Sequence, residues 1–235
     1  MFIVIKKKWL ITGICVFLSM LIIAILFITI NAKSVNSYGV QNAKYTVVID
    51  AGHGGIDGGS VGKQTNAVES KLNLEYAKNL ASQLNIMGIN TILTRSDENG
   101  LYDESAKSLK KSDMKKRKEI IENAKPNLVV SIHMNSFSSP RARGAGTFYK
   151  KDNEQGKALA TCIQKQLKTN IEYATSPSKV GDYYILNCTN LPAVLVECGF
   201  LSNPEDEALL VTKDYQNKIC YSILSGIIAF LNGNK

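Results

Sequence analysis

The chain has 235 residues, of which 45% are apolar and 20% charged, a balance typical of a folded protein and unlike that of collagen-like or disordered chains. Its 28 basic and 20 acidic side chains leave a net charge of +8, which alone would suggest nucleic-acid binding. Residues 1–44, however, hold five lysines and no acid, so the other 191 residues carry 23 basic and 20 acidic side chains, a net of +3. This distribution argues against a nucleic-acid partner, and the length favours a single domain.

Near the N-terminus, an uncharged segment from Trp9 to Ile30 follows the three lysines at positions 6–8. As a helix rising about 1.5 Å per residue, this segment reaches about 33 Å, enough to cross a hydrocarbon core of about 30 Å. A cleaved signal peptide is the alternative, but its apolar region is usually only about 7–15 residues long. The pattern predicts a cytoplasmic N-terminus at 1–8, a transmembrane anchor at 9–30, a tether at 31–44 and an extracytoplasmic domain at 45–235.

From residue 45 onward, apolar strand-like runs alternate with amphipathic helical ones. Strands are predicted at 45–50, 90–94, 128–132, 146–149, 183–186 and 193–197. Helices are predicted at 68–87, 113–124 and 153–168, and over 205–231 in one or two pieces. Near-continuous apolar strands separated by helices indicate an α/β domain with a mostly parallel sheet covered by helices on both faces.

Both histidines of the chain follow predicted strands. His53 lies in AGHGG after the first strand, His133 lies in SIHMN after the third, and Glu197 ends the last strand. In parallel sheets, ligands bind beyond the carboxyl ends of the strands. Two imidazoles and a carboxylate are ligands that zinc takes in catalytic sites, with water in the fourth position, and a nearby glutamate can move protons. The pattern therefore predicts a zinc hydrolase site at this edge.

The sequence offers two candidates for the carboxylate ligand. They are Glu69, early in the first predicted helix, and Glu197; Glu75 and Asp50 are weaker candidates. Asp50 is better placed as an acceptor for an imidazole N–H. Spacing alone does not rank Glu69 against Glu197. The cysteines, at positions 15, 162, 188, 198 and 220, have no CxxC spacing and indicate neither a disulfide framework nor a cysteine zinc site.

Four segments carry a family resemblance. They are VVIDAGHGGIDGG, VESKLNLEYAKNLASQL, VVSIHMNS and AVLVECGFLSNPEDEALL, which follow in this order over about residues 46–230. They resemble the zinc-dependent N-acetylmuramoyl-L-alanine amidases of the Amidase_3 type. The resemblance implies a twisted, mostly parallel sheet, one zinc ion per chain held by His53, Glu69 and His133, and Glu197 as the catalytic acid/base. It implies hydrolysis of the amide between N-acetylmuramic acid and L-alanine in peptidoglycan.

The architecture of one anchor and a bare catalytic domain is similar to that of the germination-specific amidases of spore-forming bacteria. Some family members carry an insertion whose helix plugs the site, but only 63 residues lie between His133 and Glu197, which predicts no plug here. The subgroup implies action on spore cortex, between the forespore and mother-cell membranes, ahead of a separate deacetylase in muramic-δ-lactam formation. An activating or anchoring partner protein is a further expectation. The alternatives are a zinc peptidase acting on another cell-wall amide and a non-catalytic wall-binding scaffold.

Candidate substrate contacts are spread over the second half of the chain. We expect Asn135 and Asn187 to orient glycan or peptide, and Arg141 and Arg143 to meet a peptide carboxylate. The basic run Lys110–Lys118 has no aromatic residues between its charges, unlike a surface for single-stranded nucleic acid. It is predicted to be a solvated helix face, with contact to anionic wall polymers or the membrane surface as the alternative.

Overall fold

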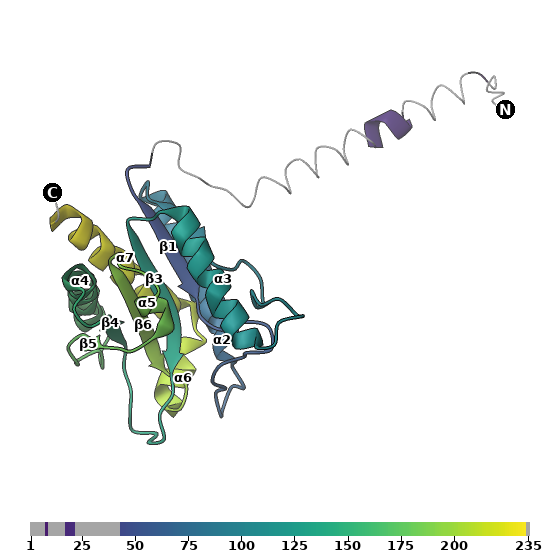
Figure 1. The fold of residues 1–235 in the computed structure, drawn as a ribbon. Coiled ribbons are helices and arrows are strands. Elements are labelled where there is room, and N and C mark those ends of the chain that lie inside the picture. Colours follow the sequence, from purple (N-terminus) through teal and green to yellow (C-terminus); the bar gives the residue numbers. More distant parts are fainter. Residues whose placement is uncertain (1–7, 9–16, 22–42, 234–235) are drawn as a thin grey trace, which may run out of the picture. The chain divides into compact units, whose positions relative to one another are not determined.

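A computed structural model of the chain describes residues 8, 17–21 and 43–233 (Figure 1). Residues 17–21 are helical, and the rest of the predicted transmembrane segment at 9–30 lies outside the described residues. No helix within the described ranges combines the length and the apolar character that crossing a bilayer requires. The residues from 43 onward form one α/β unit, which contains all the candidate site residues.

The unit is built on a six-stranded mixed sheet with the strand order β2-β1-β3-β6-β4-β5. The four strands β2, β1, β3 and β6 are parallel to one another, as predicted, whereas β4 runs antiparallel to β6 and carries β5 at the edge. The strands are β1 (Thr46–Ala51), β2 (Asn90–Leu93), β3 (Leu128–Asn135), β4 (Gly146–Tyr149), β5 (Lys179–Val180) and β6 (Ala193–Phe200).

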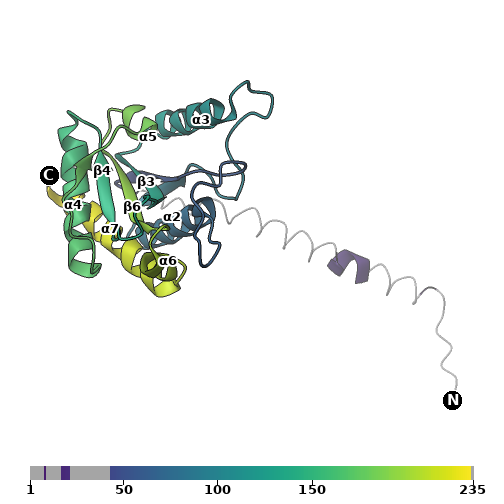
Figure 2. The same cartoon turned by 90° about the horizontal axis from the view of Figure 1, so that it is seen from below.

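The helices cover the two faces of the sheet unequally (Figures 1 and 2). Three long helices, α2 (Glu69–Ile86), α4 (Glu154–Asn170) and α7 (Lys213–Gly233), pack on one face. The other face carries only α3 (Leu109–Ala124) and the four-residue α5 (Tyr184–Asn187), while α6 (Pro204–Leu210) lies beyond the end of β6. Part of the second face is therefore left open near the carboxyl ends of the central strands.

The alternation of side chains along the central strands explains two separate apolar clusters. Val130 and Ile132 of β3 belong to the larger cluster beneath α2, α4 and α7, and Val129 belongs to the smaller one beneath α3 and α5. Because side chains on a strand alternate between faces, Ser131 and His133 share the face of Val129. The polar residues of β3 therefore lie on the sparsely covered face.

Two of the predicted elements differ from those observed. The predicted strand at 183–186 is wrong, because residues 184–187 form a helical turn that buries both Ile185 and Leu186 on one side, which a strand could not do. The predicted helix at 113–124 begins at Leu109 instead, where the hydroxyl of Ser108 accepts a hydrogen bond from the Lys111 amide and caps it. The C-terminal helical region divides into α6 and α7, one of the two predicted forms.

The packing of α4 against α7 depends on a glycine at their crossing. A Cβ added to Gly226 would lie 2.5 Å from Cα of Ile163, and Ile163 is fully buried. Because backbone atoms cannot yield as a side-chain tip can, Gly226→Ala is expected to separate the two helices and to lower the free energy of unfolding by about 1–3 kcal/mol. Chemical denaturation of the variant and the parent measures this. An unchanged midpoint would contradict the close packing.

Candidate metal centre

The carboxyl ends of three parallel strands bring the predicted site residues together. His133 lies on β3 directly opposite Glu197 on β6, and Ala51 at the end of β1 pairs with Ile132. His53 follows β1 by two residues. The prediction that these side chains meet at one edge of the sheet is thus consistent with the observed strand register.

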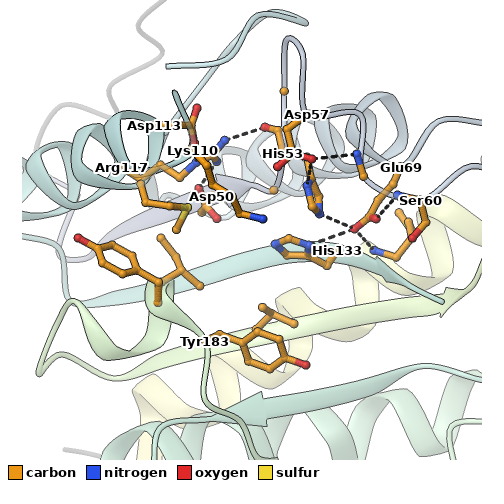
Figure 3. Close-up of a pocket in the computed structure, with 18 of the residues that line it drawn as sticks. Asp50, His53, Asp57, Ser60, Glu69, Lys110, Asp113, Arg117, His133 and Tyr183 are labelled. Atoms are coloured by element: carbon orange, nitrogen blue, oxygen red, sulfur yellow. Dashed lines mark hydrogen bonds and ion pairs between the residues drawn. The ribbon is translucent and has the colours of Figure 1, made fainter. Parts of the chain in front are cut away.

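A cavity of about 750 Å³ opens at this edge, on the face that α3 and α5 cover only in part (Figure 3). One end of it is polar and is lined by His53, Glu69, His133 and Glu197. The rest of the cavity is lined by the charged residues Lys110, Asp113 and Arg117 of α3 and by apolar and aromatic side chains, among them Leu109, Met114, Tyr183, Tyr184, Ile185 and Leu195 (Figure 3). The cavity is large enough for part of a substrate chain to lie against the polar residues.

Glu69 lies between the two imidazoles. Its Oε1 is 3.2 Å from Nε2 of His53 and 3.1 Å from Nδ1 of His133 (Figure 3). The potential ligand atoms of these three residues all lie within 4.8 Å of one another. Both carboxylate oxygens of Glu69 also accept backbone N–H groups, from Met134 at 3.2 Å and from Ser60 at 2.8 Å, which fix its orientation.

The charge state of this cluster suits a cation. Burial opposes the ionisation of Glu69, but hydrogen bonds and charge from His133 and His53 outweigh it and hold the pKa of Glu69 well below its usual range. Two imidazoles and one ionised carboxylate are a donor set that catalytic zinc takes. Of the two carboxylates that spacing left unranked, Glu69 is therefore the one placed among the imidazoles, and the three residues fit a zinc ion.

Glu197 lies beside this cluster but does not join it. Only 8% of its surface is exposed, and within the described chain its Oε2 has no hydrogen-bond partner. Burial, aided by the charge of Glu69 and opposed by that of the histidines, raises the pKa of Glu197 to about 7. A carboxyl group with such a pKa can both accept and release a proton near neutral pH.

The raised pKa of Glu197 has a consequence for the stability of the metal-free protein. The folded state holds the Glu197 proton up to about pH 7, whereas the ordinary pKa of 4.5 applies once the chain unfolds. The contribution of this group to stability therefore falls as pH rises from about 4.5 to about 7, because the unfolded state then binds fewer protons. Glutamine cannot ionise, so Glu197→Gln lacks this pH dependence. We therefore expect the melting temperature of the variant minus that of the parent to be larger at pH 8 than at pH 5. Thermal melts of both chelator-treated proteins measure this, and an identical difference at the two pH values would contradict it.

The carboxylate that lies beside Nδ1 of His53 is Asp57, not Asp50 as expected. Oδ1 of Asp57 lies 2.9 Å from Nδ1 of His53. Burial opposes the charged imidazole, but Glu69, with a smaller contribution from Asp57, outweighs it and raises the pKa of His53. Asp50 instead accepts hydrogen bonds from Thr94, Arg117 and Ser131. The alternation along β1 turns Asp50 toward α3, which sequence spacing could not reveal.

Gly52 is a point of close approach inside the site. A Cβ added there would lie 2.2 Å from Cε1 and Nε2 of the His133 ring. Gly52→Ala is therefore expected to displace the imidazole and weaken zinc binding by about 10-fold or more, within the range seen when residues that orient ligands are altered. Chelator competition on the purified variant measures this affinity. Parent-like binding would show that His133 has an alternative position.

The four candidate substrate contacts are placed unequally. Asn135, at the end of β3, lines the cavity. Arg143 pairs with Glu205 and stacks on the Tyr173 ring at 3.5 Å, and Asn187 donates to Asp182 at 2.7 Å. Arg141, Arg143 and Asn187 are not among the residues that line the cavity, so their contact with substrate stays a prediction.

The basic run on α3 is only partly the solvated face that was predicted. Lys115, Lys116 and Lys118 are solvent-accessible and pair with glutamates on the same helix. Arg117, however, is 1% exposed and bonds to Asp50 and to the backbone behind His53, so the prediction is wrong for this residue. Charge density on a helix does not show which member of the run turns inward.

Sequence reasoning also missed the carboxylate that holds the loop before Glu69. Glu207 of α6 is 1% exposed and accepts the backbone N–H groups of residues 63–65 at 2.6–3.1 Å, together with the hydroxyl of Thr65. The loop leads into α2, so this contact ties the position of Glu69 to the end of β6. The available signal was the acidic run NPEDE, which follows the apolar strand that ends near Glu197.

Comparisons with known proteins identify the family of the chain. Residues 47–229 match a family model described as N-acetylmuramoyl-L-alanine amidase. The germination-specific N-acetylmuramoyl-L-alanine amidase of Bacillus subtilis (strain 168) is 34% identical over 188 residues, which cover 78% of this chain and 78% of that protein.

Solved structures show the same fold. The CwlD amidase from Clostridioides difficile, in complex with the GerS lipoprotein, is 39% identical with a TM-score of 0.78, over 81% of this chain and 100% of that one. The catalytic domain of CwlV, an N-acetylmuramoyl-L-alanine amidase from Bacillus (Paenibacillus) polymyxa var. colistinus, is 34% identical with a TM-score of 0.71, over 80% and 98% of the two chains. The chain therefore belongs to the N-acetylmuramoyl-L-alanine amidase family and is a peptidoglycan amide hydrolase of that type.

Proposed function

We propose that this amidase is zinc-dependent, with His53, Glu69 and His133 as the ligands and Glu197 as the general acid/base. The observation that supports this is the cluster of two imidazoles around the Glu69 carboxylate. Glu197 lies opposite His133 in the same cavity, and its Oε2 has no hydrogen-bond partner within the described ranges. Zinc bound there supplies Lewis acidity and lowers the pKa of water to about 7.

The residues of the chain divide the remaining work. Glu197 accepts a proton from the attacking water and delivers it to the alanine nitrogen as the amide bond to the lactyl carbonyl breaks. Its burial makes this exchange possible near neutral pH, since the pKa of about 7 places both protonation states within reach. Asn135 and the apolar wall formed by α3 and α5 hold the substrate chain in the cavity.

The products of digestion test the reaction. Full-length protein loaded with zinc and incubated with purified peptidoglycan is expected to release peptides with a new N-terminal alanine and to leave peptide-free muramic acid. Chelator-treated protein should release neither, and added zinc should restore both. Cleavage only within the stem peptide would identify a zinc peptidase, and binding without cleavage would identify a scaffold.

We further propose that the substrate is spore cortex and that the amidase works ahead of a separate deacetylase in muramic-δ-lactam formation. The support is the similarity to the germination-specific amidase of Bacillus subtilis and to CwlD of Clostridioides difficile. Muropeptide analysis of spores lacking this protein tests it: loss of δ-lactam is the expected result. Unchanged cortex would exclude this role and leave the amidase reaction standing.

The N-terminal segment supports a proposal about location. An anchor at 9–30 behind three lysines would hold the domain at 45–235 outside the membrane, between the forespore and mother-cell membranes in a sporulating cell. A partner protein that activates or anchors the enzyme is supported by the lipoprotein bound to the similar CwlD chain. Protease added to intact protoplasts of vegetative cells that produce the full-length chain should digest the domain, and protection from protease in those cells would exclude this topology.

A further inference from the structure

Two buried arginines lie behind the loop that carries His53. Arg95 is 4% exposed and Arg117 is 1% exposed, although neither is in the cluster of candidate ligands. Burying a guanidinium is costly unless hydrogen bonds and opposite charge compensate it. The contacts of these two residues therefore need an explanation.

The two arginines donate hydrogen bonds to backbone carbonyl groups just after the end of β1. Pairing of β1 with β3 ends at Ala51, and the carbonyl groups of residues 51–53 accept hydrogen bonds from side chains, including one from Asn73 to Gly52 at 3.0 Å. The carbonyl of Ala51 accepts from Arg95 at 2.9 Å and from Arg117 at 2.8 Å, and that of Gly52 accepts from Arg95 at 3.0 Å. The carbonyl of His53 accepts from Arg117 at 2.6 Å.

Arg117 is itself held from two sides. Its Nη1 donates to Asp50 of β1 and its Nε donates to Asp113 of α3, both at 2.6 Å. The guanidinium is a rigid planar fork, so fixing two of its nitrogens fixes the direction of the third, which donates to His53. Burial opposes the charge, but Asp50 and Asp113 outweigh it and raise the pKa of Arg117, so the fork stays charged.

His53 needs such support because its backbone is unfavourable. Its φ is 60°, in the left-handed region that residues with a Cβ rarely adopt. Without a partner on its carbonyl, the loop would relax toward ordinary backbone conformations and turn the imidazole away from Glu69. The hydrogen bond from Arg117 holds the His53 carbonyl, while the contacts of the imidazole with Glu69 and Asp57 hold the other end of the residue.

We propose that Arg117 is a positioning residue for metal binding: its fork, anchored on Asp50 and Asp113, sets the direction of the His53 imidazole. This inference rests on the metal site proposed above. It assigns to a member of the basic α3 run a role different from contact with wall polymers or membrane. Lysine cannot replace it, because a single ammonium cannot reach both carboxylates and both carbonyls in one plane.

The test compares Arg117→Lys with Ile121→Ala in the full-length protein. Ile121 is 1% exposed on the same helix and belongs to the smaller apolar cluster, so its truncation loosens α3 without removing a contact to the loop. We expect Arg117→Lys to weaken zinc binding about 10–100-fold in chelator competition, and Ile121→Ala to leave the affinity within about twofold. Melting temperatures of the metal-free proteins report how far each change loosens the fold.

Two results would overturn the inference. One is parent-like zinc affinity in Arg117→Lys. The other is a loss of affinity in both variants that follows their melting temperatures, which would make the role of Arg117 structural only. If Arg117→Lys does not fold, Asp113→Asn is tested instead, because it removes one of the two carboxylates that hold the Arg117 guanidinium. Zinc binding is then expected to weaken threefold or more, and an unchanged zinc affinity would contradict the inference. A parent that binds no zinc would refute the metal site itself, an outcome distinct from these.

Discussion

Replacing Glu197 with glutamine is expected to lower kcat by about 10²–10⁴-fold while the zinc content stays at one per chain. Glutamine has nearly the same shape but can neither accept nor release the proton that the carboxyl group exchanges. Because Glu197 lies outside the cluster of candidate ligands, the metal site should persist in the variant. Muropeptide release measured beside metal analysis on the same preparation gives both quantities.

A matched control is Glu122→Gln, which makes the same chemical change on α3, at a side chain that is 58% exposed. Its kcat should equal that of the parent. If Glu197→Gln retained parent activity, Glu197 would not be the general acid/base. If the variant lost its zinc along with its activity, Glu197 would belong among the ligands, and the roles of the two carboxylates would need to be exchanged.

Replacing Glu69 with glutamine should produce the opposite pattern. The amide keeps an oxygen for coordination but removes the negative charge between the two imidazoles, so we expect zinc affinity to fall by about 100-fold or more. Activity at one zinc per chain should fall to the background, and excess zinc should restore part of it. Excess zinc should not restore Glu197→Gln, because that variant lacks a proton carrier rather than a metal.

The comparison of the two glutamine variants thus separates metal binding from proton transfer. Zinc titrations of both variants, with activity recorded at each point, are the measurement. Restoration of Glu197→Gln by zinc, or a zinc affinity in Glu69→Gln equal to that of the parent, would contradict the assignment. Cobalt substitution offers a second readout, since the visible absorption of bound cobalt should change in Glu69→Gln and remain in Glu197→Gln.

The general position of the site could be predicted because it depends on local pattern. Apolar runs that end at His53, His133 and Glu197 mark the carboxyl ends of strands, and parallel strands bring those ends to one edge. The same patterns predicted most strands and helices. The segment 183–186 was mistaken for a strand because a short apolar run does not distinguish one helical turn from a strand.

The division of labour between Glu69 and Glu197 could not be reached from spacing, and the family resemblance supplied an assignment that the geometry supports. Glu69 is 128 residues from Glu197 along the chain, and their distances to the imidazoles depend on how α2 enters the domain and on the pairing of β3 with β6. The Glu207 contacts with the loop at 63–65 take part in setting the first of these.

By itself, the sequence determined the α/β class, the edge of the sheet that carries the site, and the residue types available for chemistry there, because these follow from periodicity and strand ends. Only the tertiary structure decided that Glu69 lies between the imidazoles, that Oε2 of Glu197 has no hydrogen-bond partner among the described residues, and that Arg117 turns inward from a basic run. The reason is physical: charge state, burial and hydrogen-bond partners depend on groups that are distant in sequence and meet only when the elements pack.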